Sequence, residues 1–154
     1  MSELAQQVIT ALQGKTLSTA ESCTGGGIGA ALTAVSGSSA VYCGGMISYT
    51  NKVKSALLGV SPELLERVGA VSAEVAEAMA IGVRKSLHTD IAVSVTGLAG
   101  PGGDDFGNPV GTVYIGYADE KLCFSVPCWF SGDRESVRKQ TVEAALALIL
   151  KQNG

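Results

Sequence analysis

The chain has 154 residues, of which 46% are hydrophobic and 16% are charged, and its formal net charge at pH 7 is −3. A chain of this length and composition can fill one core with Val, Leu, Ile and Ala, so we expect a single domain over residues 1–154. The negative charge excludes a broad basic field for a nucleic-acid backbone, and no nucleic-acid partner is expected.

The N-terminal segment MSELAQQVITALQG lacks the basic start and unbroken apolar run of a signal peptide. No later segment reaches membrane-spanning length, so no membrane partner is expected. The cysteines form no CxxC pair and no zinc pattern with histidine, which favours free thiols in a reducing compartment; they are Cys23, Cys43, Cys123 and Cys128. The sequence therefore predicts a cytoplasmic protein.

Helices and strands alternate through the first half of the chain. Apolar residues at helical spacing predict a first helix over 4–12, and short β-rich runs predict strands over 16–20 and 41–50. Further helices are predicted from Gly25, over 51–57, from Ser61 with Pro62 in its first turn, and from Ser72 to about Ser86.

The second half begins with a buried strand over 90–95 that runs into a glycine loop, 96–109. Two strands, 110–118 and 121–130, follow as a hairpin, and a last helix covers about 133–151. Alternating elements followed by a hairpin predict an α/β fold, a three-layer α/β/α domain with a mixed sheet.

The segment TAESCTGGG lies between the first strand and a helix, at the sheet edge where open α/β folds bind ligands. Ser22 in this segment could be a nucleophile beside backbone N–H groups that stabilise an oxyanion. It could equally be a helix cap, and the residues alone leave both interpretations open.

Gly25, Gly27 and Ala30 also fit a GxGxxA dinucleotide fingerprint, which would indicate hydride transfer with NAD. That interpretation requires an acidic residue about 20 positions on, and the sequence there reads SYTNKVK. The fingerprint is therefore weakly supported.

A serine nucleophile needs a base. The only histidine, His88, follows a helix that returns to the opposite end of the sheet, so a Ser-His-Asp triad is not favoured. A lysine whose pKa is lowered can accept the serine proton, and Lys52 and Lys54 are the candidates. Both follow Tyr49, whose phenol could relay a proton or hold the lysine, although solvated surface lysines are the alternative.

The loop TGLAGPGG follows another strand, and its glycines allow either an anion nest or plain turns. Asp104 and Asp105 resemble a metal or ribose site, but adjacent acids in a loop are more often solvated, and they are given no catalytic role. Arg134 and Arg138 lie one helical turn apart and could bind one phosphate or carboxylate, or form surface ion pairs.

Together these segments resemble the CinA C-terminal domain family, whose members include nicotinamide mononucleotide deamidases. The resemblance spans nearly the whole chain and is carried by six ordered segments: AESCTGG (20–26), YTNKVKSALLGV (49–60), GAVS (69–72), VTGLAGPGG (95–103), PVGTVYIG (109–116) and FSGDRESVR (130–138). One departure is Asn108, which stands where relatives often carry a lysine.

The resemblance implies hydrolysis of nicotinamide mononucleotide to nicotinic acid mononucleotide and ammonia, without metal or other cofactor. It implies Ser22 as nucleophile, Lys54 as base and Tyr49 as an assisting group. The residues that bind this small pyridine nucleotide are then expected to be Thr24, Gly25, Gly26, Asn51, Thr96, Gly97, Gly100, Gly102, Gly103, Thr112, Arg134 and Arg138.

Two alternatives stay open beside this expectation. The domain could be a non-catalytic nucleotide-binding or interaction module of the same fold, and Cys23 could supply a thiolate at a helix N-terminus. An enzyme this small could also form a homodimer.

Overall fold

The computed structural model describes residues 2–154, so Met1 alone of the predicted domain lies outside the described residues. Its centre is a five-stranded sheet in the order β2-β1-β3-β4-β5. The neighbours of β1 run parallel to it, and β4 and β5 add two antiparallel pairings. The strands are β1 (Leu17–Glu21), β2 (Tyr42–Ile47), β3 (Ile91–Gly97), β4 (Thr112–Ala118) and β5 (Cys123–Trp129).

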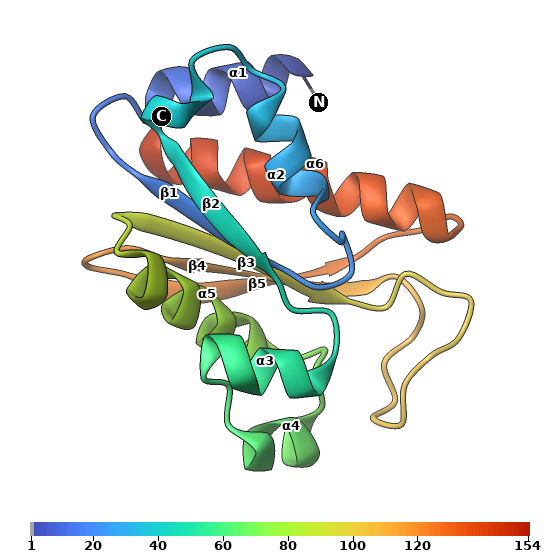
Figure 1. Cartoon of the computed structure of the whole chain (residues 1–154). Helices are drawn as coiled ribbons and strands as arrows, with labels where there is room; N and C mark the ends of the chain where they lie inside the picture. Colours follow the sequence, from blue (N-terminus) through green and yellow to red (C-terminus); the bar gives the residue numbers. More distant parts are fainter. Residues whose placement is uncertain (1) are drawn as a thin grey trace.

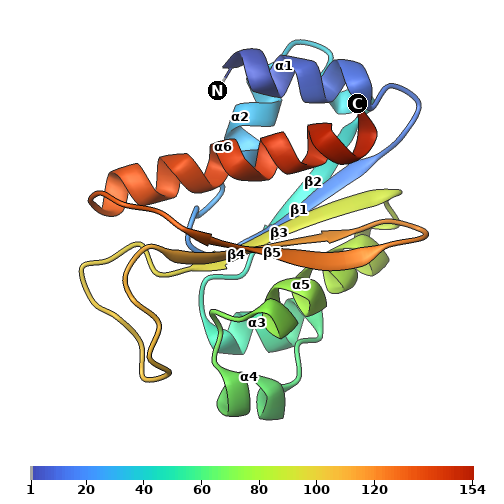
Figure 2. The ribbon, with the colours of Figure 1, turned by 180° about the vertical axis from the view of Figure 1, so that it is seen from behind.

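Helices cover both faces of the sheet (Figures 1 and 2). One layer holds α1 (Ser2–Ala11), α2 (Gly27–Thr33) and α6 (Arg134–Asn153), which contact one another, with a short 3-10 turn at Ser38–Ala40. The other holds α3 (Asn51–Leu58), α4 (Pro62–Val68) and α5 (Ala73–Leu87), with α5 packed on the sheet. This arrangement confirms the predicted three-layer α/β/α fold with a mixed sheet.

Two apolar clusters hold the layers together, one on each face of the sheet. Along β3, Ile91, Val93 and Val95 face the cluster under α1, α2 and α6, whereas Ala92 faces the cluster under α5. Successive strand side chains point to opposite faces, so the nearly continuous apolar run of β3 serves both clusters. Among residues 2–154, none of the helices has the length and apolar character needed to cross a bilayer.

The predicted elements are all present, with shifted ends. α2 begins at Gly27 rather than Gly25, because Gly25 and Gly26 have φ of 59° and 107°, outside the right-handed helical region. β2 ends at Ile47 rather than residue 50, because Thr50 is the N-cap of α3 and its side chain accepts from the Val53 N–H.

The three parallel strands end at one edge of the sheet. Glu21, the last residue of β1, pairs with Ile47 of β2 and with Val95 of β3. The segments that follow these strands must therefore meet at this edge, where open α/β sheets bind ligands. The residues that follow β1, β2 and β3 include Ser22, Tyr49 and Gly100 respectively.

Candidate functional site

The side chains of Ser22 and Lys54 meet at this edge. Lys54 Nζ lies 2.9 Å from Ser22 Oγ, and the residues are 6% and 1% exposed. Ser22 is fixed by its position directly after β1, where its N–H donates to the Val95 carbonyl. Lys54 lies in the first turn of α3 and faces the sheet, whereas Lys52 on the same helix is exposed. The structure thus pairs Ser22 with the lysine expected as its base.

The partners of the Lys54 ammonium are neutral. Besides the Ser22 hydroxyl, Nζ contacts the Tyr49 carbonyl at 3.2 Å, and Ser22 Oγ lies 3.4 Å from the same carbonyl. Burial lowers the pKa of Lys54 to about 8, because an amine removed from water favours its uncharged form, with a smaller opposing effect from Cys23. A lysine with this pKa can take up the serine proton near neutral pH.

A cavity of about 400 Å³ opens in front of this pair. It takes its wall from the ends of the parallel strands, from α3 and from the glycine loop. Its lining includes these residues expected from the sequence: Ser22, Tyr49, Asn51, Lys54, Thr96, Gly97, Gly100, Gly102 and Arg134. The volume is in the range of small-molecule sites.

Arg134 joins two walls of the cavity. Its Nη1 donates to the Gly100 carbonyl at 2.7 Å, and its Nη2 donates to the Tyr49 hydroxyl at 3.1 Å. The Tyr49 phenol is 56% exposed, and only the backbone carbonyl of this residue contacts Lys54. The phenol expected to assist Lys54 is therefore bound to the guanidinium instead.

Two of the residues expected to bind the ligand at the start of α2, Gly25 and Gly26, use their backbone N–H groups inside the protein. The Gly25 N–H donates to the Ser22 carbonyl, and the Gly26 N–H donates to the Glu21 carboxylate, as do those of Ile28 and Gly29. No pyrophosphate fits where a carboxylate already fills the helix N-terminus. The dinucleotide fingerprint is therefore not supported.

Several other expected binding residues lie outside the cavity lining. The Thr24 hydroxyl donates to Glu21, and the buried Thr112 hydroxyl donates to the Pro109 carbonyl. Arg138 donates from Nε and Nη2 to the carbonyls of Cys23 and Thr24. Gly103 lies in the glycine loop, near the Asn108 carbonyl. These hydrogen bonds lie within the protein and stabilise the segments around the cavity.

One wall of the cavity was not expected from the sequence. It consists of Ala70, Val71, Leu98 and Ala99, together with the Cys23 side chain. Thr96 Oγ1 donates to the Ala70 carbonyl and Asn108 Nδ2 to that of Val71, which ties the loops of this wall together. Small apolar residues carry no chemical signal; the GAVS motif contains Ala70 and Val71, and the TGLAGPGG loop contains Leu98 and Ala99.

Cys23 and His88 have no reactive arrangement here. Burial raises the pKa of the Cys23 thiol to about 11, which disfavours the thiolate. His88 closes α5 and lies before β3, at the opposite end of the sheet from Ser22. Within residues 2–154, no three His, Cys, Asp or Glu side chains gather in a way that could hold a metal ion.

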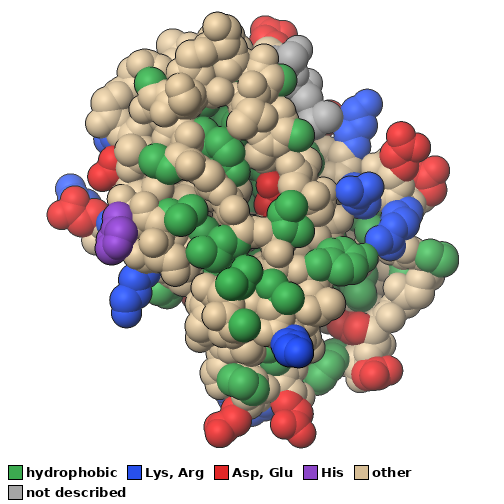
Figure 3. All heavy atoms as spheres, viewed as in Figure 1, with side chains coloured by type: hydrophobic (Ala, Val, Ile, Leu, Met, Phe, Trp, Pro, Cys, Tyr) green, Lys and Arg blue, Asp and Glu red, His purple; other side chains and the backbone are tan. Residues whose placement is uncertain are grey.

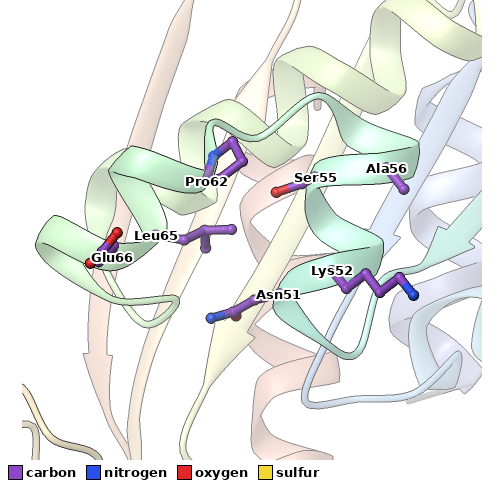
Figure 4. A pocket seen from close by; sticks show the side chains of 7 residues that line it. All are labelled: Asn51, Lys52, Ser55, Ala56, Pro62, Leu65 and Glu66. Atoms are coloured by element: carbon purple, nitrogen blue, oxygen red, sulfur yellow. The ribbon is translucent and has the colours of Figure 1, made fainter.

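A larger groove, of about 680 Å³, lies between α3 and α4. Figure 4 shows Leu65 pointing from α4 toward α3, with Asn51 and Ser55 on the facing helix. Asn51 is the one residue that the lining of this groove shares with the Ser22 cavity. Among the described residues that line the groove, Lys52 and Ser55 form no hydrogen bond with each other, so the groove offers no counterpart of the Ser22–Lys54 contact. On the face shown in Figure 3, apolar side chains gather across the middle, and most of the basic and acidic side chains lie toward the rim.

Comparison with known proteins identifies the family of this chain. The model of the CinA C-terminal domain matches residues 1–153. The chain belongs to the CinA C-terminal domain family. A CinA-like protein from Cyanothece sp. is 58% identical over 120 residues, covering 78% of this chain and 29% of its own length. One from Parasynechococcus marenigrum is 53% identical over 148 residues, covering 93% and 35%.

Solved structures of the family share the fold. A CinA superfamily protein from Klebsiella pneumoniae superposes with a TM-score of 0.95 at 35% identity, covering 98% of this chain and 96% of its own. The competence/damage inducible protein CihA from Agrobacterium tumefaciens gives a TM-score of 0.95 at 40% identity, covering 99% and 95%. The chain spans about a third of the length of its curated relatives.

Proposed function

We propose that this CinA-family domain is an amidohydrolase that converts nicotinamide mononucleotide to nicotinic acid mononucleotide and ammonia, with Ser22 as nucleophile and Lys54 as base. The observation that carries the proposal is the buried contact of 2.9 Å between Lys54 Nζ and Ser22 Oγ at the floor of a small-molecule cavity. The reaction needs no metal. Its physiological role would be the recycling of pyridine nucleotide in the cytoplasm.

The first step would be acyl transfer to Ser22. Neutral Lys54 takes the Ser22 proton as Oγ bonds to the carboxamide carbon, and the carbonyl electron pair moves onto oxygen. The tetrahedral intermediate then collapses, the C–N bond breaks, and Lys54 returns the proton to the departing nitrogen, which leaves as ammonia. The Ser22 hydroxyl is free to turn toward Nζ because its contact with the Tyr49 carbonyl is long, at 3.4 Å.

The oxyanion requires donors that are not already used. Within residues 2–154, the N–H groups of Cys23 and Thr24 donate to no other residue, in contrast to those of Ser22, Gly25 and Gly26. The N–H of the residue after a nucleophilic serine is a common oxyanion donor. We assign the oxyanion to the N–H groups of Cys23 and Thr24.

The second step would be hydrolysis of the ester. Lys54, neutral again after ammonia has left, takes a proton from water, and the hydroxide oxygen bonds to the acyl carbon. The bond from the acyl carbon to Ser22 Oγ then breaks, and the proton held by Lys54 returns to Oγ. The products are the free acid and the original serine.

The ribose phosphate would lie along the glycine loop. Arg134 lines the cavity, and its recorded partners are a carbonyl and a phenol, both uncharged. A guanidinium with only neutral partners is available to a phosphate through charge-assisted hydrogen bonds. Asn51 and the backbone of Gly102, which is exposed, supply further polar groups in the same cavity. This anchoring would orient the small carboxamide over Ser22.

The test is to incubate the purified protein with nicotinamide mononucleotide, with and without a chelator, and to measure both products. The proposal predicts equal amounts of ammonia and nicotinic acid mononucleotide and no effect of the chelator. Free nicotinamide, which lacks the ribose phosphate, should be a much poorer substrate. Binding of the nucleotide without turnover would contradict the amidase and favour a nucleotide-binding module.

A further inference from the structure

Glu21, the residue before Ser22, is a buried acid that the proposed mechanism does not use. Its side chain is 2% exposed and accepts four hydrogen bonds. Oε1 accepts from the Thr24 hydroxyl at 2.5 Å and from two N–H groups, those of Gly26 at 3.2 Å and Ile28 at 2.9 Å. Oε2 accepts from the Gly29 N–H at 3.0 Å. A buried carboxylate is tolerated only with such partners.

These bonds replace the ordinary cap of α2. The N-cap residue, Gly26, has φ of 107° and offers no side chain. The Gly27 N–H donates to the Thr24 carbonyl at 3.1 Å, but the N–H groups of Ile28 and Gly29 have no acceptor from the N-cap residue. Glu21 supplies that acceptor from the end of β1. The helix therefore begins where the carboxylate places it, directly after the Ser22 turn.

The turn from Ser22 to Gly26 is held from two sides. The Gly26 N–H and the Thr24 hydroxyl donate to Glu21, while Arg138 on α6 donates to the carbonyls of Cys23 at 3.0 Å and Thr24 at 3.1 Å. Before the turn, the backbone of Glu21 is fixed by the Ser48 N–H, which donates to its carbonyl at 2.8 Å. Glu21 thus accepts from donors of the turn, and Arg138 donates to its carbonyl acceptors.

We propose that Glu21 is a positioning residue for the reaction: its carboxylate orients the turn that carries Ser22 and the N–H groups of Cys23 and Thr24. By accepting from the Gly26 N–H and the Thr24 hydroxyl, the carboxylate fixes the turn around the two N–H groups assigned to the oxyanion. Arg138 supports the turn from the other side. The expected effect on kcat rests on the proposed amidase activity. The role of Glu21 in holding the turn does not depend on that activity.

The variant Glu21→Gln tests the inference, because glutamine has the same size as glutamate. Its amide places an NH₂ donor where a carboxylate oxygen accepts from N–H groups. We expect kcat to fall at least about tenfold while KM changes less than about threefold, since the substrate-binding groups remain and only alignment is lost. The midpoint of the pH–rate profile should stay in place, because Lys54 is untouched. Thr24→Val, which removes one of the bonds, should act in the same direction more weakly.

A matched control separates positioning from general loss of stability. Thr141→Val replaces a buried hydroxyl on α6 that donates only to the Val137 carbonyl, away from the turn. It should retain the parent kcat whatever its effect on thermal stability. If kcat instead follows thermal stability across all three variants, the positioning role is overturned.

Amide hydrogen exchange gives a readout that does not depend on the amidase. In Glu21→Gln, the N–H groups of Gly26, Ile28 and Gly29 should exchange faster, while those of α5 remain protected. This result supports the positioning role even if the parent protein does not hydrolyse the nucleotide, in which case only the proposed function fails. Unchanged exchange at these three positions, or an unchanged kcat in an active parent, overturns the inference. If Glu21→Gln does not fold, Thr24→Val decides by the same measurements.

Discussion

Lys54 Nζ lies 2.9 Å from Ser22 Oγ, although the two residues are 32 positions apart in the chain. The parallel pairing of β1 with β2 produces this contact, because the turn after β1 and the helix after β2 emerge at the same edge of the sheet. The fold thus brings the proposed nucleophile and the proposed base together.

The pH dependence of the rate follows from the base. With the pKa of Lys54 lowered to about 8, the reactive neutral amine is about a tenth of the enzyme at pH 7 and predominates above pH 9. We expect log kcat/KM to rise with unit slope below pH 8 and to level off above it. A profile that is flat between pH 6 and 9 would contradict Lys54 as the base.

Replacing Lys54 by Met should abolish turnover yet stabilise the fold at neutral pH. Below pH 8 the native state must bury a charged ammonium, at a cost on the order of 1–3 kcal/mol. Between pH 8 and 10.5 the unfolded chain binds the proton that the native state has lost, so parent stability rises with pH. The advantage of Lys54→Met in urea unfolding should therefore shrink over this window. An advantage that grows with pH would be inconsistent with a lowered pKa.

Arg134→Met should weaken binding of the phosphate. Loss of a charge-assisted contact should raise KM for nicotinamide mononucleotide by roughly tenfold to a hundredfold. Nicotinamide riboside, which lacks the phosphate, should be affected far less. Arg67→Met on α4 is the matched control. Equal effects on both substrates would show that Arg134 acts by holding Tyr49 and Gly100 rather than by binding phosphate.

Tyr49→Phe should have a small effect. The substitution removes the hydroxyl that accepts from Arg134 but keeps the backbone carbonyl that contacts Lys54 and Ser22. We expect kcat to fall less than about tenfold, which is a smaller loss than removal of a general acid or base causes. A loss of a thousandfold with an altered pH profile would instead indicate proton transfer by the phenol.

Cys23 should be chemically inert despite lining the cavity. With a thiol pKa of about 11, on the order of one thiol in a thousand is ionised at pH 8. Iodoacetamide should label Cys23 far more slowly than a free thiol, and Cys23→Ala should retain turnover because it keeps the backbone N–H. Rapid labelling with parallel inactivation would contradict this account.

The sequence predicted the layers because periodicity and turn residues are local signals. The resemblance to the CinA family selected Ser22 and Lys54 as candidates, and their contact follows from their positions after β1 and β2. The sequence could not show that Glu21 fills the N-terminus of α2, because its partners at Gly26, Ile28 and Gly29 are backbone groups with no side-chain signature.

The arginines show the same limit of sequence reasoning. Arg134 and Arg138 lie one turn apart and seemed equivalent, yet one lines the cavity and the other binds carbonyls of the Ser22 turn. Their different roles depend on which loop each side chain meets, and helical spacing alone does not fix that.

The most direct test of the serine mechanism compares kcat/KM of the parent, Ser22→Ala and Ser55→Ala on nicotinamide mononucleotide. Ser55 lies on α3 in the neighbouring groove and is the matched control. The account predicts a loss of at least about a thousandfold in Ser22→Ala and little change in Ser55→Ala. Turnover by Ser22→Ala within tenfold of the parent would contradict it.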